Sequence, residues 1–429
     1  MLSYNLSLLF KANTEHLNKA NLIKIFATMF LDMFSLSFTM GYSIYFKNVA
    51  LPNIDRYQFL FIVSGVLLCS QLLKTYGFFY ASSQSRLKFN SPMTSIILIG
   101  FCYLLMTLPS YFQFNYFFMV FILLLLLLKS LLIGYDLGLL LRFAQLNFRP
   151  TDGKVIFIVI LLIYDLGILA GIFTTRLVIE GEITPNKIGS FYRLQEILCF
   201  LIAMLIAYSR KDITKQMLYY NNYSRRFFIN NIKHYWKKII IRSLIVSYHI
   251  FLIYMVAFKV PSSLDMIFGY AQYEINRILL IMTLFGIVGA NSVFLISKLF
   301  KPVNILSGLF IISIIISIIK MSSNTWLLDD LYYISILMLT AFIYGGFLRA
   351  TPMVLAPIND FPQRYQLINR FISYMLAYAI WGMLAMFILD FSHYITHRFK
   401  DDSFSELTIF YVSICLVGLY KYINEHRNQ

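Results

Sequence analysis

The sequence is poor in charged residues. Of its 429 residues only 13% are charged, whereas 59% are hydrophobic, 17% are aromatic and the mean hydropathy is +0.71. Soluble domains carry about 25% charged residues, so this composition excludes an ordinary soluble enzyme, a disordered chain and a secreted disulfide scaffold. Twelve bilayer-spanning helices of about 20 residues would occupy about 240 residues, which is close to the hydrophobic share of the chain.

Cysteine is scarce as well. The four cysteines lie inside apolar runs at scattered spacings, with no CxxC pair and no cluster of histidines beside them: Cys69, Cys102, Cys199 and Cys415. We interpret them as small buried hydrophobic residues, and we expect neither a disulfide nor a metal site.

The motifs of enzymes and nucleotide-driven pumps are missing. The chain has no GxxxxGK[ST] phosphate loop, no HExxH and no GxSxG, which argues against ATP-driven transport and against a membrane hydrolase. His393 and His397 have the i, i+4 spacing of zinc ligands, but their position near an outer loop favours a solvated membrane boundary. We therefore expect no enzymatic activity, no cofactor and no metal.

Long apolar runs are what the chain does contain. Twelve are long enough to span a membrane, at about 21–46, 57–80, 92–110, 116–145, 154–178, 191–208, 240–259, 276–297, 303–320, 331–355, 368–390 and 404–421. They predict an all-α polytopic membrane protein. The only long polar connection runs from Ser209 to about Lys238. It predicts two six-helix halves, residues 1–208 and 240–429, joined by a basic loop at 209–239.

The positive charges predict the orientation in the membrane. The polar connection carries eight Lys and Arg residues against one acid, Asp212. With the N-terminus inside, the inner loops and tails hold 22 Lys and Arg, the outer loops 10 and the spans four. Because positive residues concentrate in cytoplasmic loops, we expect both termini and the basic loop in the cytoplasm, and a location in a cell membrane of the bacterial inner-membrane type.

The net charge of +16 then needs no nucleic acid partner. Anionic lipid headgroups of the bilayer explain it, and a specific protein or nucleotide site in the basic loop is the alternative.

A short string recurs at half the chain length. Gln145 to Pro150 follows the fourth run and Ile358 to Arg364 follows the tenth, and their phenylalanines are 213 residues apart. Two parallel six-helix repeats with a substrate held between them are a known plan of transporters. The string therefore supports the two-halves prediction.

Three stretches resemble one transporter family: Gly134-Tyr135-Asp136-Leu137-Gly138 with Phe148-Arg149-Pro150, then Phe361-Pro362-Gln363-Arg364-Tyr365, and Val246-Ser247-Tyr248-His249 through Tyr254. They are similar to the major facilitator superfamily, and within it to the metabolite:proton symporters that include proline/betaine transporters. The resemblance implies a secondary active transporter that works by alternating access as a monomer. Its substrate would be a small polar organic solute, a zwitterion such as proline or betaine or a carboxylate, carried with protons.

The chain also departs from this family. The family's loop after the second span usually reads G-x-x-x-D-R-x-G-R-R, but here Gly77 is followed by Ala81, Ser82 and Arg86. The acid, the first arginine and the second glycine are absent, and glycine makes up only about 4% of the chain against an average near 7%. A second hypothesis therefore stays open: a transport-inactive paralogue that acts as a membrane interaction or sensor protein.

Ionisable residues inside the apolar runs are the first candidates for a functional site, because each costs at least about 2.5–3.5 kcal/mol at bilayer depth. Asp32, Lys129 and Asp165 fall near mid-depth of the first, fourth and fifth runs. We expect Lys129 to neutralise one carboxylate and to leave the other free for a proton, or else to form a permanent ion pair. Asp136, two turns after Lys129, belongs either to a gate or to the inner end of the helix.

Polar aromatic residues and an arginine complete the candidate set. Tyr248, His249, Tyr254 and Trp381 would suit a zwitterionic or quaternary amine, although packing is the ordinary use of such rings. Arg349 would either bind a substrate carboxylate or anchor the cytoplasmic end of its helix.

Two G-x-x-x-G spacings predict places where helix backbones touch. They are Gly134 with Gly138 and Gly167 with Gly171.

Overall fold

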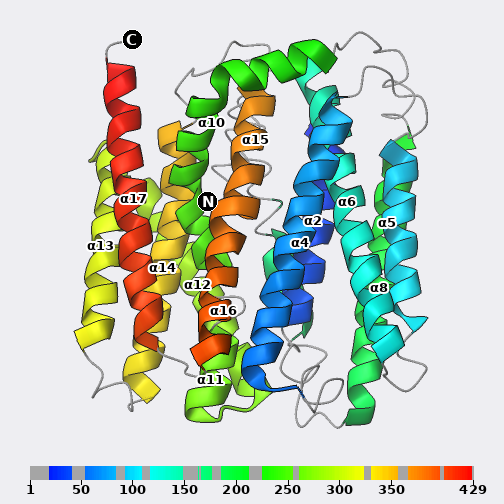
Figure 1. Ribbon diagram of the computed structural model, residues 1–429, viewed down its shortest axis with the longest axis horizontal. Coiled ribbons are helices and arrows are strands. Elements are labelled where there is room, and N and C mark those ends of the chain that lie inside the picture. Colours follow the sequence, from blue (N-terminus) through cyan, green and yellow to red (C-terminus); the bar gives the residue numbers. More distant parts are fainter. Residues whose placement is uncertain are drawn as a thin grey trace. The chain divides into compact units, whose positions relative to one another are not determined.

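The computed structural model describes residues 19–40, 54–83, 92–108, 116–147, 163, 166–175, 185–211, 225–254, 260–322, 330–355, 366–396 and 401–427. Nearly all of these residues are helical (Figure 1). The predicted all-α fold class is confirmed.

A helical segment occurs at each of the twelve predicted spans. They are α2 (Lys19–Met40), α4 (Arg56–Ser83), α5 (Pro92–Met106), α6 (Tyr116–Asn147), residues 166–175, α8 (Pro185–Ser209), α10 (Arg225–Tyr254), α12 (Gln272–Ile296), α13 (Pro302–Ser322), α14 (Asp330–Leu355), α15 (Gln366–Leu376) with η5 (Ala377–Gly382) and α16 (Met383–Thr396), and α17 (Asp401–Arg427). Among the described residues, seven helices are long and apolar enough to cross a membrane.

The outward faces of these helices are apolar. Leu124, Leu205 and Val417 are 61%, 69% and 68% exposed. Soluble proteins rarely expose apolar surface on this scale, whereas lipid tails accept it.

Two helices begin six or more residues earlier than hydropathy predicts. Helix α8 begins at Pro185, six residues before the predicted start, because proline suits the first turn of a helix. Helix α10 begins at Arg225, so residues 225–239 of the expected basic loop are helical. Hydropathy marks only the apolar part of a helix, and the backbone continues through residues such as Lys and Arg that favour helix.

One short helix lies where no element was predicted. Helix α11 covers Val260–Phe268 and is followed by Gly269, whose φ of +65° lies in the left-handed region that glycine adopts without steric cost.

The chain divides into two compact units. The first unit is Met1–Pro52, Val66–Trp236 and Phe361–Phe371, and the second is Asn53–Gly65, Lys237–Asp360 and Ile372–Gln429. Helices α4, α10 and α15 therefore contribute residues to both units. The division into halves at 208 and 240 stays a prediction.

The pairing of helices repeats between the units. In the first unit α5 packs against α6 and α8, and in the second α13 packs against α14 and α17. Counted by spans, the third contacts the fourth and sixth, and the ninth contacts the tenth and twelfth. This repeat, six spans apart, supports the two-halves prediction.

Glycines let the second and fourth spans touch, and likewise the eighth and tenth. A Cβ at Gly134 of α6 would lie 1.8 Å from the carbonyl oxygen of Lys74 on α4. A Cβ at Gly345 of α14 would lie 1.7 Å from the carbonyl oxygen of Gly286 on α12. No larger residue fits at such distances, so the backbones approach closely there.

The predicted close packing is confirmed at Gly134, and also at two further glycines of the G-x-x-x-G pairs. A Cβ at Gly138 would lie 2.6 Å from the oxygen of Phe78, and one at Gly167 would lie 2.7 Å from the oxygen of Phe30. The close packing predicted at Gly171 stays a prediction.

Candidate functional site

Five helices, α2, α4, α5, α6 and α8, bring polar side chains of the first unit together inside apolar helical segments. We call these residues the central cluster: Asp32 and Ser35 on α2, Lys74 on α4, Tyr103 on α5, Lys129 on α6, and Gln195 and Glu196 on α8. The cluster holds two acids and two bases at a depth where single charges are costly.

Asp32 forms an ion pair with Lys74, a residue that the sequence analysis did not single out. The side chains of Lys74 and Asp32 are 10% and 18% exposed. Of the two carboxylates predicted as possible partners of Lys129, Asp32 is therefore paired with a different base. Lys74 reaches Asp32 because α4 touches α6 at Gly134, a contact that places its backbone in the helix bundle. The sequence feature that could have identified Lys74 is its position as a single lysine inside the apolar run 57–80.

Lys129 is buried among polar and aromatic groups. Its ammonium nitrogen lies 4.7 Å from the centre of the Tyr103 ring and 3.5 Å from the hydroxyl oxygen of Ser35. The face of an aromatic ring attracts a cation, and this attraction is stronger away from water. Within the described residues Lys129 forms no salt bridge. Asp165, its other predicted partner, lies outside the described residues.

Glu196 is the second acid of the cluster, and the sequence did not single it out. The predicted apolar run begins at residue 191, so Glu196 was expected near the end of a span, whereas α8 begins at Pro185. Its side chain is 3% exposed. Its Oε1 accepts a hydrogen bond of 3.2 Å from the amide of Gln195, and its buried Oε2 has no hydrogen-bond partner in the described structure. The positive charge of Lys129 also acts on this carboxyl group.

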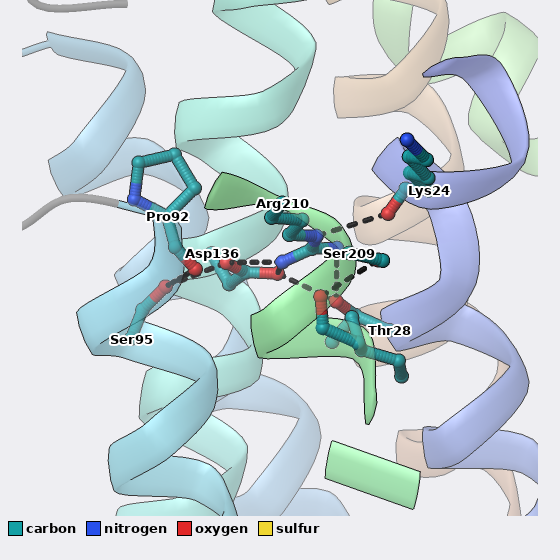
Figure 2. A network of polar contacts seen from close by, with 8 residues as sticks. Lys24, Thr28, Pro92, Ser95, Asp136, Ser209 and Arg210 are labelled. Carbon is teal, nitrogen blue, oxygen red and sulfur yellow. Dashed lines mark hydrogen bonds and ion pairs between the residues drawn. The ribbon is translucent and has the colours of Figure 1, made fainter. Parts of the chain in front are cut away.

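A second polar network surrounds Asp136 (Figure 2). Both oxygens of its carboxylate accept hydrogen bonds from one guanidinium nitrogen of Arg210, at 3.0 and 2.9 Å. The hydroxyls of Thr28 and Ser95 donate to the same carboxylate, each at 2.6 Å. Arg210 also donates to Thr28 at 2.6 Å and to the carbonyl oxygen of Lys24 at 2.9 Å.

This network connects four helices of one unit. It joins α2, α5, α6 and the end of α8, and neither Asp136 nor Arg210 has exposed side-chain surface. Arg210, counted among the loop cations, is thus a buried structural partner. For Asp136 the geometry favours holding the helices of the unit together, and a role in a gate stays a prediction.

In the second unit Tyr248 lies in an aromatic cluster. It is 1% exposed, and the ring centres of Phe251, Phe310, Phe347 and Tyr411 are 5.0–6.3 Å away. This environment favours packing over substrate binding. His249 and Tyr254 belong to α10, but their side chains lie outside the described residues.

The remaining candidates of the second unit have partners of their own. Trp381 lies in the π-helical segment η5 and donates from its indole nitrogen to the hydroxyl of Ser243 at 3.0 Å. The guanidinium carbon of Arg349 lies 5.7 Å from the centre of the Phe294 ring.

The expected solvated boundary at the histidine pair is not what the structure shows. His393 is 4% exposed and Asp390 is also 4% exposed, because α16 turns both toward the interior of its unit. His397 lies outside the described residues. Among the described residues no group of three or more His, Cys, Asp or Glu side chains is placed to hold a metal ion.

No sequence model of a protein family matches the chain, and no curated protein matches it in sequence. Solved structures, however, match it over almost its whole length. A D-xylose–proton symporter is 10% identical with a TM-score of 0.65, over 94% of this chain and 96% of the symporter. An auto-inhibited peptide transporter of the POT family is 11% identical with a TM-score of 0.62, over 95% and 97%.

A third structure, a bacterial homologue of the iron transporter ferroportin in an outward-facing state, is 11% identical with a TM-score of 0.60, over 95% of this chain and 99% of that one. The chain therefore has the multi-pass membrane fold of major facilitator superfamily transporters. Because these three proteins are named for a sugar, a peptide and iron, this fold does not decide the solute. The proline/betaine type stays a prediction.

Proposed function

We propose that the chain is a secondary active transporter that moves a small polar organic solute by alternating access and is driven by protons. The observation that carries this proposal is the central cluster. Two acids and two bases lie within apolar helices, and only Asp32 and Lys74 among them form an ion pair. Placing charged residues at bilayer depth costs free energy, so in a transporter fold we expect such residues to bind a solute or a proton.

The charge balance of the cluster supports a solute that carries a carboxylate. Lys74 neutralises Asp32, so Lys129 is the base that stays outside an ion pair in the described structure. The Lys129 ammonium, held over the Tyr103 ring, attracts an anionic group such as the carboxylate of a solute. Both a zwitterion such as proline or betaine and a simple carboxylate fit this arrangement.

The second candidate function is a transport-inactive membrane interaction or sensor protein. The observation that favours it is the missing acid, arginine and glycine after Gly77. Under this alternative the cluster would still bind a ligand, but no solute would cross the membrane.

Uptake into vesicles separates the two functions. The purified protein is reconstituted, and uptake of proline, glycine betaine, lactate and xylose is measured with and without an imposed proton gradient. We expect the gradient to drive accumulation of at least one of the first three solutes, and Lys129→Met to abolish it.

Lys298→Met is the matched control, because Lys298 lies 5.5 Å from the centre of the Phe294 ring but is exposed. It should transport normally. If vesicles with wild-type protein take up every solute at the rate of empty vesicles, the transporter proposal is wrong.

A further inference from the structure

The three acids described in the helices of the first unit differ in their partners. Asp32 faces Lys74, and Asp136 faces Arg210 together with two hydroxyls. Glu196 has only the neutral amide of Gln195 as a hydrogen-bond partner. It is therefore the one acid of this set that no cation holds in its ionised form through a direct contact.

This difference decides which acid can exchange a proton. Protonating Asp32 or Asp136 would leave a buried cation without its counter-charge, which is strongly unfavourable. Protonating Glu196 removes a charge from a buried position, and its Oε2, now without a partner, gains a hydrogen that it can donate. Among these three described acids, gain and loss of a proton are thus both compatible with the fold only at Glu196.

A chain of polar contacts joins Glu196 to Lys129. The amide of Gln195 donates to Glu196 at 3.2 Å and to the backbone oxygen of Ser35 at 3.4 Å. The ammonium of Lys129 lies 3.5 Å from the hydroxyl of the same serine. The titratable and charged groups that interact with Glu196 in the described structure are Lys129 from α6, Tyr103 from α5 and Cys199 on its own helix. Asp32 from α2 interacts with Tyr103, and Cys102 from α5 interacts with Lys129.

We propose that Glu196 binds the transported proton, and that Lys129 couples this proton to an anionic group of the solute. While Lys129 is unoccupied, its charge favours the carboxylate form of Glu196. A solute carboxylate bound to Lys129 cancels that charge, and Glu196 then takes up a proton. Because binding free energies are reciprocal, a protonated Glu196 also strengthens anion binding, which is the behaviour of a symporter.

This inference rests on the proposed function, so its test uses a measurement that needs no solute. Infrared difference spectra of the purified protein in lipid vesicles, taken between acidic and alkaline pH, record the C=O band of a protonated carboxyl group. We expect a buried band that is lost as the pH rises and that shifts when glutamate is labelled with ¹³C. Glu196→Gln should remove it, and Glu196→Asp should retain a band that no longer shifts with the glutamate label.

Controls test the assignment to Glu196. Glu274→Gln, which changes a glutamate at the N-terminus of α12, should leave the band unchanged, and so should Asp165→Asn. Lys129→Met should change the pH range over which the band is lost, because the positive charge that acts on the Glu196 carboxyl group is gone. This variant also keeps the proposal testable if Glu196→Gln fails to fold.

The outcomes separate this inference from the proposed function. If the labelled band persists in folded Glu196→Gln protein, or if this variant still accumulates solute on a proton gradient, the assignment to Glu196 is overturned and the transporter proposal stands. If no solute is moved by the wild-type protein, the transporter proposal fails and with it the transport of a proton, whatever the infrared spectra show.

Discussion

Asp136 and Arg210, 74 residues apart in the chain, form an ion pair of 2.9 Å in which neither side chain has exposed surface. The hydroxyls of Thr28 and Ser95 satisfy the remaining capacity of the carboxylate. A buried pair with such complete hydrogen bonding holds its helices in one arrangement, because any shift would expose a charge to a medium that cannot solvate it.

Removing one member of this pair should destabilise the protein. Arg210→Met leaves Asp136 buried without its counter-charge, which costs about 3–5 kcal/mol. We expect a lower melting temperature and a lower folded yield in detergent, measured by thermal unfolding and size-exclusion chromatography. Adding Asp136→Leu should recover part of the loss. Lys211→Met, which changes the exposed neighbour, is the control, and an equal loss in both single variants would contradict the assignment.

The partner of Asp32 can be measured with double-mutant cycles. Residues in direct contact show coupling energies of about 0.5–3 kcal/mol, whereas groups without contact add independently. We expect Asp32→Asn to relieve most of the destabilisation caused by Lys74→Met, and to leave that caused by Lys129→Met unchanged. Equal coupling energies in the two cycles would show that Asp32 interacts with Lys129 as strongly as with Lys74, which would contradict the ion pair described here.

A further double-mutant cycle tests the prediction that Lys129 pairs with Asp165. If it does, Lys129→Met should be rescued by Asp165→Leu in thermal unfolding. If the double variant stays as unstable as Lys129→Met, Lys129 is held by Tyr103 and Ser35 instead, as its contacts indicate.

The close helix contacts at Gly134 and Gly345 should not tolerate replacement of glycine by alanine. Gly134→Ala and Gly345→Ala each place a Cβ less than 2 Å from a backbone oxygen of the neighbouring helix, so the helices must separate. We expect both variants to lower the melting temperature. Gly308→Ala is the matched control, because a Cβ there meets no atom within 4 Å, and it should be neutral or stabilising by up to about 1 kcal/mol. A Gly134→Ala protein as stable as Gly308→Ala would contradict the crossing.

The predicted topology can be tested with an impermeant thiol reagent. In a variant with the exposed Cys69 changed to serine, Asn222→Cys should react only after cells are opened, because it lies in the connection predicted to be cytoplasmic. Asn48→Cys, between the first two spans, should react on intact cells. If Asn222→Cys is labelled on intact cells, the connection lies outside the cell and the predicted orientation is wrong.

Local sequence properties were sufficient for the fold class and for a helical segment at each of the twelve predicted spans, but not for the starts of α8 and α10 or for α11. Runs of apolar residues mark spans wherever they occur, because burying a backbone in lipid requires helix and apolar side chains together. Asp32, Lys129 and Asp136 can be recognised in the same way, since each is a charged residue inside an apolar run. Glu196 cannot, because it lies near the predicted start of its run at residue 191, whereas α8 begins at Pro185.

Only the tertiary structure decided which of these groups meet. Depth along a helix can be counted from the sequence, and on that basis Asp32 matched Lys129 as well as any other cation. Its partner is Lys74, because the direction in which each helix turns a side chain and the close contact at Gly134 depend on packing between distant segments. Arg210 likewise lies in a polar, basic stretch of the sequence that predicts a loop, but its side chain forms a buried ion pair. Apolar burial is a property of each residue, whereas ion pairing is a property of two residues brought together by the fold.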